Sequence, residues 1–286
     1  MQTTIQNPIS CYGIGVHSGK TTQITLKPAK INSGIIFVRN DVSGFDNVVN
    51  ATYDRVFDTT LSTSINNDAK VSVSTIEHLM AAIWGCNISN LIVEIDGPEV
   101  PIMDGSSKPF VFMIECAGIK KQNAHRKFLK ILKEIIVTDK DSEIIIRPYK
   151  NTQVDVTIDF ASSAIGRQHH AYSSQTNFIE EIASSRTFGF LHELKYMQSK
   201  GLALGASLDN AIGIDNDVIL NHEGLRHSNE FARHKLLDLL GDLFTAGGNF
   251  IGKLEGFKTS HSLNNILLQK IFENPFSYQW VNFNDI

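Results

Sequence analysis

The residues best suited to chemistry are a histidine and an aspartate one helical turn apart, His234 and Asp238, in a stretch predicted to be helical from about residue 229 to 244. Side chains at i and i+4 share one face of a helix, and Asp242 continues that row. An imidazole and a carboxylate so placed suit a catalytic zinc site, which uses three protein ligands and leaves a fourth position for water. The spacing also fits a solvated polar face on which Asp238 pairs with Lys235. The opposite face can form a buried stripe of Leu236, Leu239, Leu240 and Leu243.

The third ligand has several candidates among the ten histidines. His78 directly follows Glu77 near the start of a predicted helix, and a carboxylate beside a zinc ligand is what deprotonation of an attacking water requires. Glu77 has an alternative role, because Ser74-x-x-Glu77 has the form of a capping box. The residue pattern alone does not choose His78 over His17 or His261.

Other chemical motifs fail on their spacing. Residues 15–21 resemble a phosphate-binding loop, but Ile14 stands where the first glycine is required, and the residues that follow alternate like a strand. His222 and His227 are five residues apart, unlike the i, i+4 pair of zinc proteases. The adjacent residues 169 and 170, both histidine, are expected to be surface polar residues.

The sequence predicts groups of strands followed by groups of helices. Hydrophobic periodicity and turn signals predict strands at 23–27, 35–39, 91–95, 131–137, 143–147 and 153–160. They predict helices at about 76–84, 106–117, 178–183, 191–200 and 229–244. Strands and helices in blocks favour a layered α+β architecture over strict βαβ alternation. The basic segment 120–127 is predicted to link two halves.

Composition excludes several classes of protein. A chain of 286 residues, 42% hydrophobic and 20% charged, predicts about two globular domains. The net charge of −4 argues against a nucleic-acid partner. Three scattered cysteines indicate a reducing compartment, and we find neither a signal peptide nor a transmembrane segment. We therefore expect a cytoplasmic protein.

Five further motifs are similar to those of a known protein family. They are Ser-Thr-Ile-Glu-His at 74–78, Met-Asp-Gly-Ser at 103–106, Ser-Arg-Thr-Phe-Gly-Phe at 185–190, Arg-His-Lys-Leu-Leu-Asp-Leu-Leu-Gly-Asp-Leu at 233–243 and His-Ser-Leu-Asn-Asn at 261–265. Together with Gly-Ile-Gly-Val-His-Ser-Gly-Lys at 13–20, they closely resemble the bacterial UDP-3-O-acyl-N-acetylglucosamine deacetylases, in register over essentially the whole chain.

The resemblance implies an α+β fold of two similar layered domains, each a sheet packed against helices, with the active site at the domain interface. We place the domains at residues 1–121 and 127–286, with an acyl-chain-binding insert at about 188–211.

Carried over by position, the resemblance implies one zinc ion per chain, held by His78, His234 and Asp238. It makes Glu77 the general base and His261 the general acid.

The same carry-over implies roles around the substrate. Asp242 would keep the acid protonated, Thr187 would stabilise the oxyanion, and Lys235 would lie beside the substrate. Phe160 would contact the uridine end. The passage for the acyl chain would be lined by Phe188, Leu191, Leu194, Leu202, Ala203, Leu208 and Ala211.

The implied activity is zinc-dependent hydrolysis of the N-acetyl group of UDP-3-O-(3-hydroxyacyl)-N-acetylglucosamine. This is the committed step of lipid A biosynthesis and releases acetate and a free amine. A paired base and acid predict a bell-shaped pH dependence. The expected partner is this UDP-linked acylated amino sugar, and the expected state is a monomer. Two alternatives remain: a zinc amidohydrolase acting on another N-acetylated sugar, and a non-catalytic metal-binding protein that retains the scaffold.

The sequence departs from the family pattern at four places. Ser260 precedes His261 where glycine is expected, and Ala-Ser-Ser follows Phe160 where a more polar Asn-His-Pro is usual. Ser62 replaces a cysteine found in some members, a change that should spare catalysis. The sequence ends without the apolar tail that recruits a regulatory membrane protease in some relatives, so we do not expect control by that route.

Overall fold

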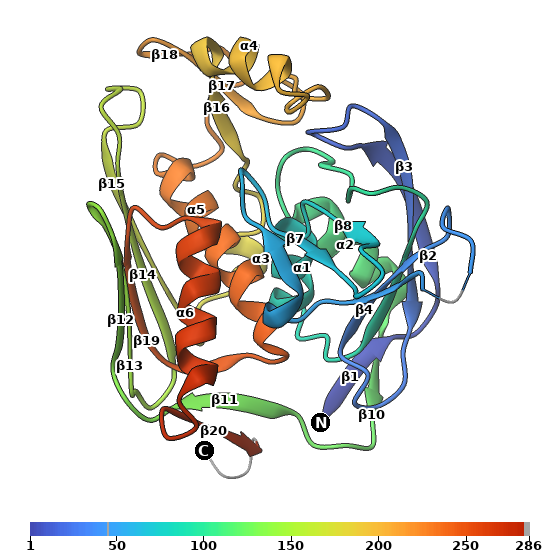
Figure 1. Ribbon diagram of the computed structural model, residues 1–286. Helices are drawn as coiled ribbons and strands as arrows, with labels where there is room; N and C mark the ends of the chain where they lie inside the picture. Colours follow the sequence, from blue (N-terminus) through green and yellow to red (C-terminus); the bar gives the residue numbers. More distant parts are fainter. Residues whose placement is uncertain (45, 283–286) are drawn as a thin grey trace.

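Two β-sheets form the outer layers of the molecule and enclose a double layer of helices (Figure 1). The structure is a computed structural model that describes residues 1–44 and 46–282. None of the helices in this described part is long and apolar enough to cross a bilayer. The layered α+β architecture expected from the sequence is confirmed.

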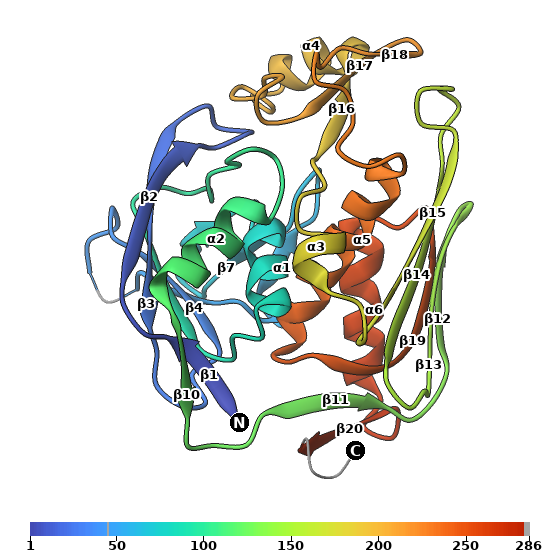
Figure 2. The same ribbon diagram turned by 180° about the vertical axis from the view of Figure 1, so that it is seen from behind.

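The first sheet has five strands in the order β2-β3-β9-β4-β5. They are β2 (Ile9–Ile14), β3 (Thr21–Pro28), β9 (Leu91–Ile95), β4 (Ile35–Arg39) and β5 (Val48–Asn50). Side chains on β3 alternate between buried and accessible, as the period of a strand requires. The helices α1 (Glu77–Gly85) and α2 (Lys108–Ala117) lie on its inner side (Figure 2). A small sheet of β6 (Val56–Asp58), β7 (Ser64–Asn66) and β8 (Ser72–Val73) lies beside them, preceded by a 3₁₀ turn at Tyr53–Arg55.

The second sheet has seven strands. The path β12-β13-β19-β11-β20 is formed by β12 (Ile135–Asp139), β13 (Ser142–Arg147), β19 (Phe250–Phe257), β11 (Lys127–Ile131) and β20 (Tyr278–Asn282). β14 (Thr152–Asp159) joins β19 in parallel and carries β15 (Arg167–Ser173). The helices α5 (Glu230–Leu243) and α6 (His261–Glu273) cover the inner side of this sheet, with a 3₁₀ turn at Phe244–Ala246 after α5 (Figure 1).

Helices α1 and α5 meet in the middle of the molecule at a glycine. A Cβ atom on Gly241 would lie 2.0 Å from the backbone oxygen of Glu77 and 3.2 Å from the backbone nitrogen of Ala81. Only a residue without a side chain allows the two backbones to approach so closely. This contact also buries the polar row of α5, so the solvated-face alternative for that helix is wrong.

A third unit projects from one end of the two layers (Figures 1 and 2). It contains β16 (Phe188–Phe190), α4 (Leu191–Ser199), β17 (Ile212–Asp215) and β18 (Val218–Ile219), with the strands in the order β16-β17-β18. The short helix α3 (Phe178–Glu181) precedes it. The unit begins where the insert was predicted to begin and continues past residue 211, because β17 pairs in parallel with β16.

Several local predictions were wrong. Residues 120–122 of the expected linker belong to β10 (Ile119–Gln122), which pairs with β1 (Gln2–Ile5). The strand predicted at 131–137 is two strands, because β11 pairs with β19 and β20 whereas β12 pairs with β13. Helix α6 was not predicted, although apolar residues recur along it at helical spacing (Leu263, Leu267, Leu268 and Ile271). The exact limits of the two domains stay a prediction.

Candidate metal centre and active site

Three buried side chains from two helices converge between the sheets. His78 comes from α1, and His234 and Asp238 come from consecutive turns of α5. Oδ1 of Asp238 lies 3.4 Å from Nε2 of His78 and 3.3 Å from Nε2 of His234. Ligand atoms arranged tetrahedrally around zinc at bond lengths of about 2.0–2.1 Å stand roughly 3.3 Å apart. Both distances from Oδ1 of Asp238 therefore match the spacing of ligands in a tetrahedral metal site, and the three ligand atoms all lie within 4.8 Å of one another.

The chemistry of these donors also fits a divalent metal. Oδ1 of Asp238 is buried and has no hydrogen-bond partner among the described residues. The ring of His234 places Nδ1 3.1 Å from the backbone oxygen of Ser185, so Nδ1–H donates there and Nε2 is left with its lone pair. Burial lowers the pKa of His234 to about 4, which keeps the imidazole neutral, as a metal ligand must be. Oδ2 of Asp238 accepts a hydrogen bond of 2.7 Å from Nζ of Lys235.

Glu77 faces this centre instead of capping its own helix. The residue at the N-cap of α1 is Ile76, without a side-chain cap, and the hydroxyl of Ser74 donates to the backbone oxygen of Pro98 at 3.1 Å. The capping-box reading of Glu77 is therefore wrong. Burial raises the pKa of the Glu77 carboxyl, and its Oε1 lies 3.9 Å from Nε2 of His261.

His261 is the first residue of α6, and its ring is paired with Asp242. Nδ1–H donates to Oδ2 of Asp242 at 2.8 Å. Burial by itself would lower the pKa of His261, but the charge and hydrogen bond of Asp242, helped by the charge of Glu77, raise it to about 9. The imidazole is thus protonated at neutral pH. Ser260, where the family pattern has glycine, is the N-cap of α6 and accepts a hydrogen bond from the backbone N–H of Leu263 at 3.2 Å.

Thr63 joins the carboxylates of Glu77 and Asp242 and was missed by the sequence analysis. Its backbone N–H donates to Oε2 of Glu77 at 3.0 Å, and its hydroxyl donates to Oδ1 of Asp242 at 2.6 Å. The side-chain amide of Asn264 donates to Oδ2 of Asp242 at 2.8 Å. Nothing in the run Leu61-Ser-Thr-Ser distinguishes this threonine, because its partners lie on α1 and α5.

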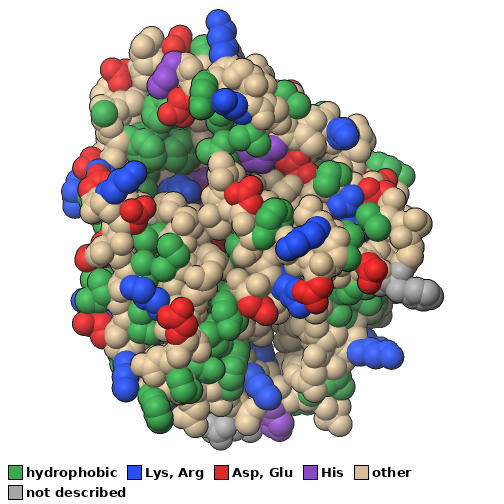
Figure 3. All heavy atoms as spheres, viewed as in Figure 1, with side chains coloured by type: hydrophobic (Ala, Val, Ile, Leu, Met, Phe, Trp, Pro, Cys, Tyr) green, Lys and Arg blue, Asp and Glu red, His purple; other side chains and the backbone are tan. Residues whose placement is uncertain are grey.

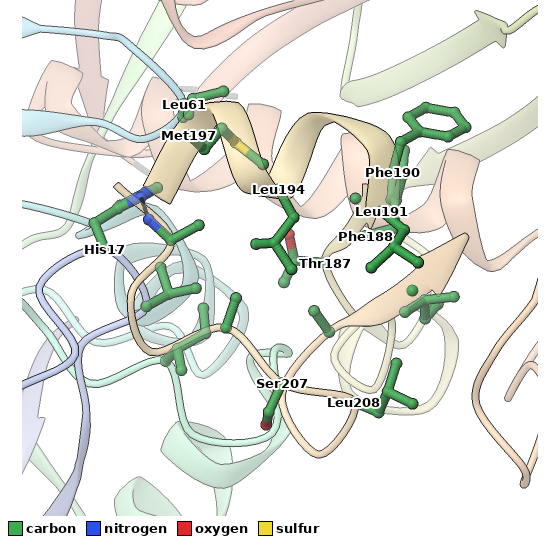
Figure 4. A pocket seen from close by; sticks show the side chains of 18 of the residues that line it. His17, Leu61, Thr187, Phe188, Phe190, Leu191, Leu194, Met197, Ser207 and Leu208 are labelled. Carbon is green, nitrogen blue, oxygen red and sulfur yellow. Dashed lines mark hydrogen bonds between the residues drawn. The ribbon is translucent and has the colours of Figure 1, made fainter. Parts of the chain in front are cut away.

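Thr187 stands at the join between the metal centre and the projecting unit. Its backbone N–H donates to Gly105 at 2.8 Å, and its backbone oxygen accepts from Ile212 at 2.7 Å. Its side chain points into a cavity of about 340 Å³ (Figure 4). The wall of this cavity also includes Glu77 and His78.

The rest of that cavity is mostly apolar, and its other polar lining residues are His17, Thr75 and Ser207. Helix α4 contributes Leu191, Leu194 and Met197 to its wall, and Leu194 points inward (Figure 4). Hydrophobic side chains also gather on the molecular surface just below the projecting unit (Figure 3). Of the residues predicted to line the acyl passage, six line this cavity: Phe188, Leu191, Leu194, Ala203, Leu208 and Ala211.

The other two predicted substrate contacts lie elsewhere. Leu202 is not among the lining residues, and neither is Phe160. The Phe160 ring packs edge-on against that of Phe188, with centroids 5.6 Å apart, so it supports the wall from behind. Lys235 is mostly buried, and although burial would lower the pKa of its amine, Asp238 raises it.

The motifs set aside at the outset supply none of the three metal-binding side chains. The loop at 15–19 joins two strands, β2 and β3, so it does not open a helix as a phosphate-binding loop would. His227 contacts the hydroxyl of Ser184 through Nε2 at 2.9 Å. His169 is exposed on β15, and His170 is half-buried there.

Comparison with known proteins agrees with the geometry. A model of the UDP-3-O-acyl N-acetylglycosamine deacetylase family matches residues 2–273. The UDP-3-O-acyl-N-acetylglucosamine deacetylases of Haemophilus influenzae (strain 86-028NP) and Pasteurella multocida (strain Pm70) are each 44% identical to this chain, over 99% of it and 94% of their own length. The deacetylase of the same name from Histophilus somni (strain 129Pt) is 43% identical with the same coverage. This chain therefore belongs to the UDP-3-O-acyl N-acetylglycosamine deacetylase family.

Proposed function

We propose that this protein is a zinc-dependent amidohydrolase that removes the N-acetyl group of UDP-3-O-(3-hydroxyacyl)-N-acetylglucosamine. The products are acetate and the free amine, and the reaction is the committed step of lipid A biosynthesis. The observation that carries the proposal is the placing of a buried His-His-Asp cluster beside a carboxylate and a protonated histidine, at one end of an apolar cavity. The names of the relatives supply the identity of the sugar.

The residues divide the chemistry between them. Zinc held by His78, His234 and Asp238 would polarise the acetyl carbonyl and activate the attacking water. Glu77 takes the proton of that water, and its buried carboxylate is suited to this because burial raises its pKa.

Breakdown of the tetrahedral intermediate needs an acid, because an amine anion cannot leave. His261 is charged at neutral pH and donates the proton to the departing nitrogen. The hydroxyl of Thr187, which points into the cavity, donates to the oxyanion. One such donor typically stabilises the transition state by about 3 kcal/mol.

The apolar cavity receives the acyl chain, and Lys235 lies beside the sugar. Phe160 packs against Phe188 and does not line the cavity, so we assign it only a minor role in binding the uridine end. One zinc ion per monomer and the two-domain division are further parts of this proposal. The described cysteines are all free thiols, which supports the cytoplasmic location expected from the sequence.

Acetate release from the acylated UDP-sugar tests the proposal. Protein treated with a chelator should lose activity and regain it with one equivalent of zinc. Shortening the acyl chain should lower kcat/KM, whereas a zinc amidohydrolase for another N-acetylated sugar would be indifferent to it. Folded, zinc-loaded protein that binds the metal but releases no acetate would support the non-catalytic alternative.

A further inference from the structure

Glu99 is a buried carboxylate that the mechanism does not use. Its side chain is 1% exposed, and among the described residues it forms no ion pair. Its oxygens accept hydrogen bonds from the backbone N–H groups of His17 and Ser18, both at 2.8 Å, and from the hydroxyl of Thr75 at 3.1 Å. A buried charge is tolerated only when such donors replace its water.

These contacts explain the loop that resembles a phosphate-binding motif. Two successive backbone N–H groups aimed at one anion form a nest of the kind that holds phosphates. A Cβ atom on Gly15 would lie 2.2 Å from Oε2 of Glu99, so the carboxylate fills the space in front of the loop. The loop at 15–19 therefore does bind an anion, and that anion is a side chain of the same protein.

The loop in turn holds the projecting unit. The backbone oxygen of His17 accepts from the N–H of Leu204 at 3.1 Å, and that of Val16 accepts from the N–H of Gly205 at 3.0 Å. A Cβ atom on Gly205 would lie 2.3 Å from the backbone oxygen of Gly15, so the two loops are in direct backbone contact.

The same contact forms part of the cavity wall. Val16 and His17 from the loop, Ala203 from the projecting unit and Thr75 all line the cavity that ends at the metal centre. Glu99 accepts hydrogen bonds from His17 and Thr75 directly. Val16 precedes His17 in the loop, and the backbone N–H of Ala203 lies 3.4 Å from Nδ1 of His17. Glu99 thus holds a loop that forms part of the wall of this cavity.

We propose that Glu99 is a positioning residue that sets the selectivity of this enzyme for acylated substrate. Its carboxylate orders the loop at 15–19, and the loop fixes the wall against which the acyl chain packs. This role rests on the proposed function. It predicts an effect on KM that depends on the acyl chain, because Glu99 touches neither the metal ligands nor the acid and base.

Glu99→Gln tests the proposal with almost no change in size. A glutamine offers one acceptor oxygen and turns its NH₂ toward a backbone N–H, so one loop donor loses its partner. We expect KM for the long-chain substrate to rise on the order of tenfold, as for the loss of one charged hydrogen bond. The kcat for that substrate and the rate on UDP-N-acetylglucosamine, which lacks the acyl chain, should change by less than about twofold.

The matched control is Glu94→Gln. Glu94 lies on β9, where its partly exposed carboxylate pairs with Lys27 at 2.6 Å, and this variant should behave like the wild type. A second variant, Gly205→Ala, pushes the two loops apart without altering Glu99 and should reproduce the increase in KM. Should Glu99→Gln prove unstable, Gly205→Ala carries the kinetic test.

Amide hydrogen exchange gives a readout that does not depend on activity. In Glu99→Gln, residues 15–19 and 203–205 should exchange faster than in the wild type, and helix α5 should not. Equal loss of kcat/KM on both substrates, or unchanged exchange in the loop, would overturn the proposal. Wild-type protein inactive on both substrates would overturn the proposed function and the role in selectivity with it, while the exchange data would still decide whether Glu99 orders the loop.

Discussion

Replacing Asp242 with asparagine isolates the group that keeps the catalytic acid protonated. The pKa of His261 is about 9 against an ordinary 6.5, and the charge of Asp242 outweighs the effect of burial. Asparagine keeps the shape of the side chain but removes the charge. Burial then dominates, with Lys235 acting in the same direction and the charge of Glu77 opposing them, and the pKa of His261 should fall to 6.5 or below.

The size of the effect depends on pH in a way that can be worked out. An acid works only while protonated, so activity is lost as pH rises through its pKa. With a pKa of about 9, His261 is about 90% protonated at pH 8, and with a pKa of 6.5 it is about 3% protonated. The loss of activity in Asp242→Asn that comes from deprotonation of His261 therefore grows from less than about twofold at pH 6 to about 30-fold at pH 8.

The assay is the pH profile of kcat/KM for acetate release between pH 5.5 and 9.5, with zinc-loaded protein. Asp141→Asn is the control, since this exposed carboxylate pairs with Lys258 at 2.7 Å and is not among the groups that shift the pKa of His261. The descending limb of the profile should move to lower pH by about 2.5 units or more in Asp242→Asn alone. A loss that is equally large at pH 6 and pH 8 would refute the reasoning, because it would mean that Asp242 does not control the protonation of His261.

Three other substitutions test the packing around the site. Gly241→Ala should lower the free energy of unfolding, measured in urea, by about 1–3 kcal/mol, because its Cβ would collide with the backbone of α1. An unchanged unfolding midpoint would contradict this. Thr63→Val should lower kcat by about tenfold or more by leaving an oxygen of Asp242 without its donor, and Thr63→Ser should restore it; valine with normal kcat would dismiss the role of the hydroxyl. Arg186→Met should cost about 3–5 kcal/mol of unfolding free energy, because it leaves Glu230 buried without its partner at 2.9 Å; a small loss in the same measurement would show that Glu230 finds other compensation.

Local periodicity explains why much of the fold could be predicted. Strands β4 and β9 have the limits expected from their apolar runs, and α5 begins and ends within a residue of its predicted span. In these elements the apolar residues recur at the period of the backbone, every second residue in a strand and every third to fourth residue in a helix, so the buried face can be recognised from the sequence. The strand predicted at 131–137 failed because partner choice, which divides it into β11 and β12, is not written in any local period.

The spacing of His234, Asp238 and Asp242 is enough to place them on one face of a helix, because a helix has 3.6 residues per turn. Resemblance then named His78, Glu77 and His261 as their partners. The burial of this row, which rules out a solvated face, is visible only in the folded protein. The row is buried because α1 packs against α5 at Gly241, and this close approach depends on the backbone of α1 as well as on the sequence of α5.

The same distinction separates the residues that were expected from those that were not. Thr63 and Glu99 carry no motif, because a hydroxyl or carboxylate acquires its role from donors and acceptors distant in the chain. Glu77 illustrates the reverse case, in which a local pattern offered a capping role as an alternative that the fold does not use. Spacing along the chain determines which side chains point the same way, whereas long-range packing determines what they meet and whether water is excluded when they do.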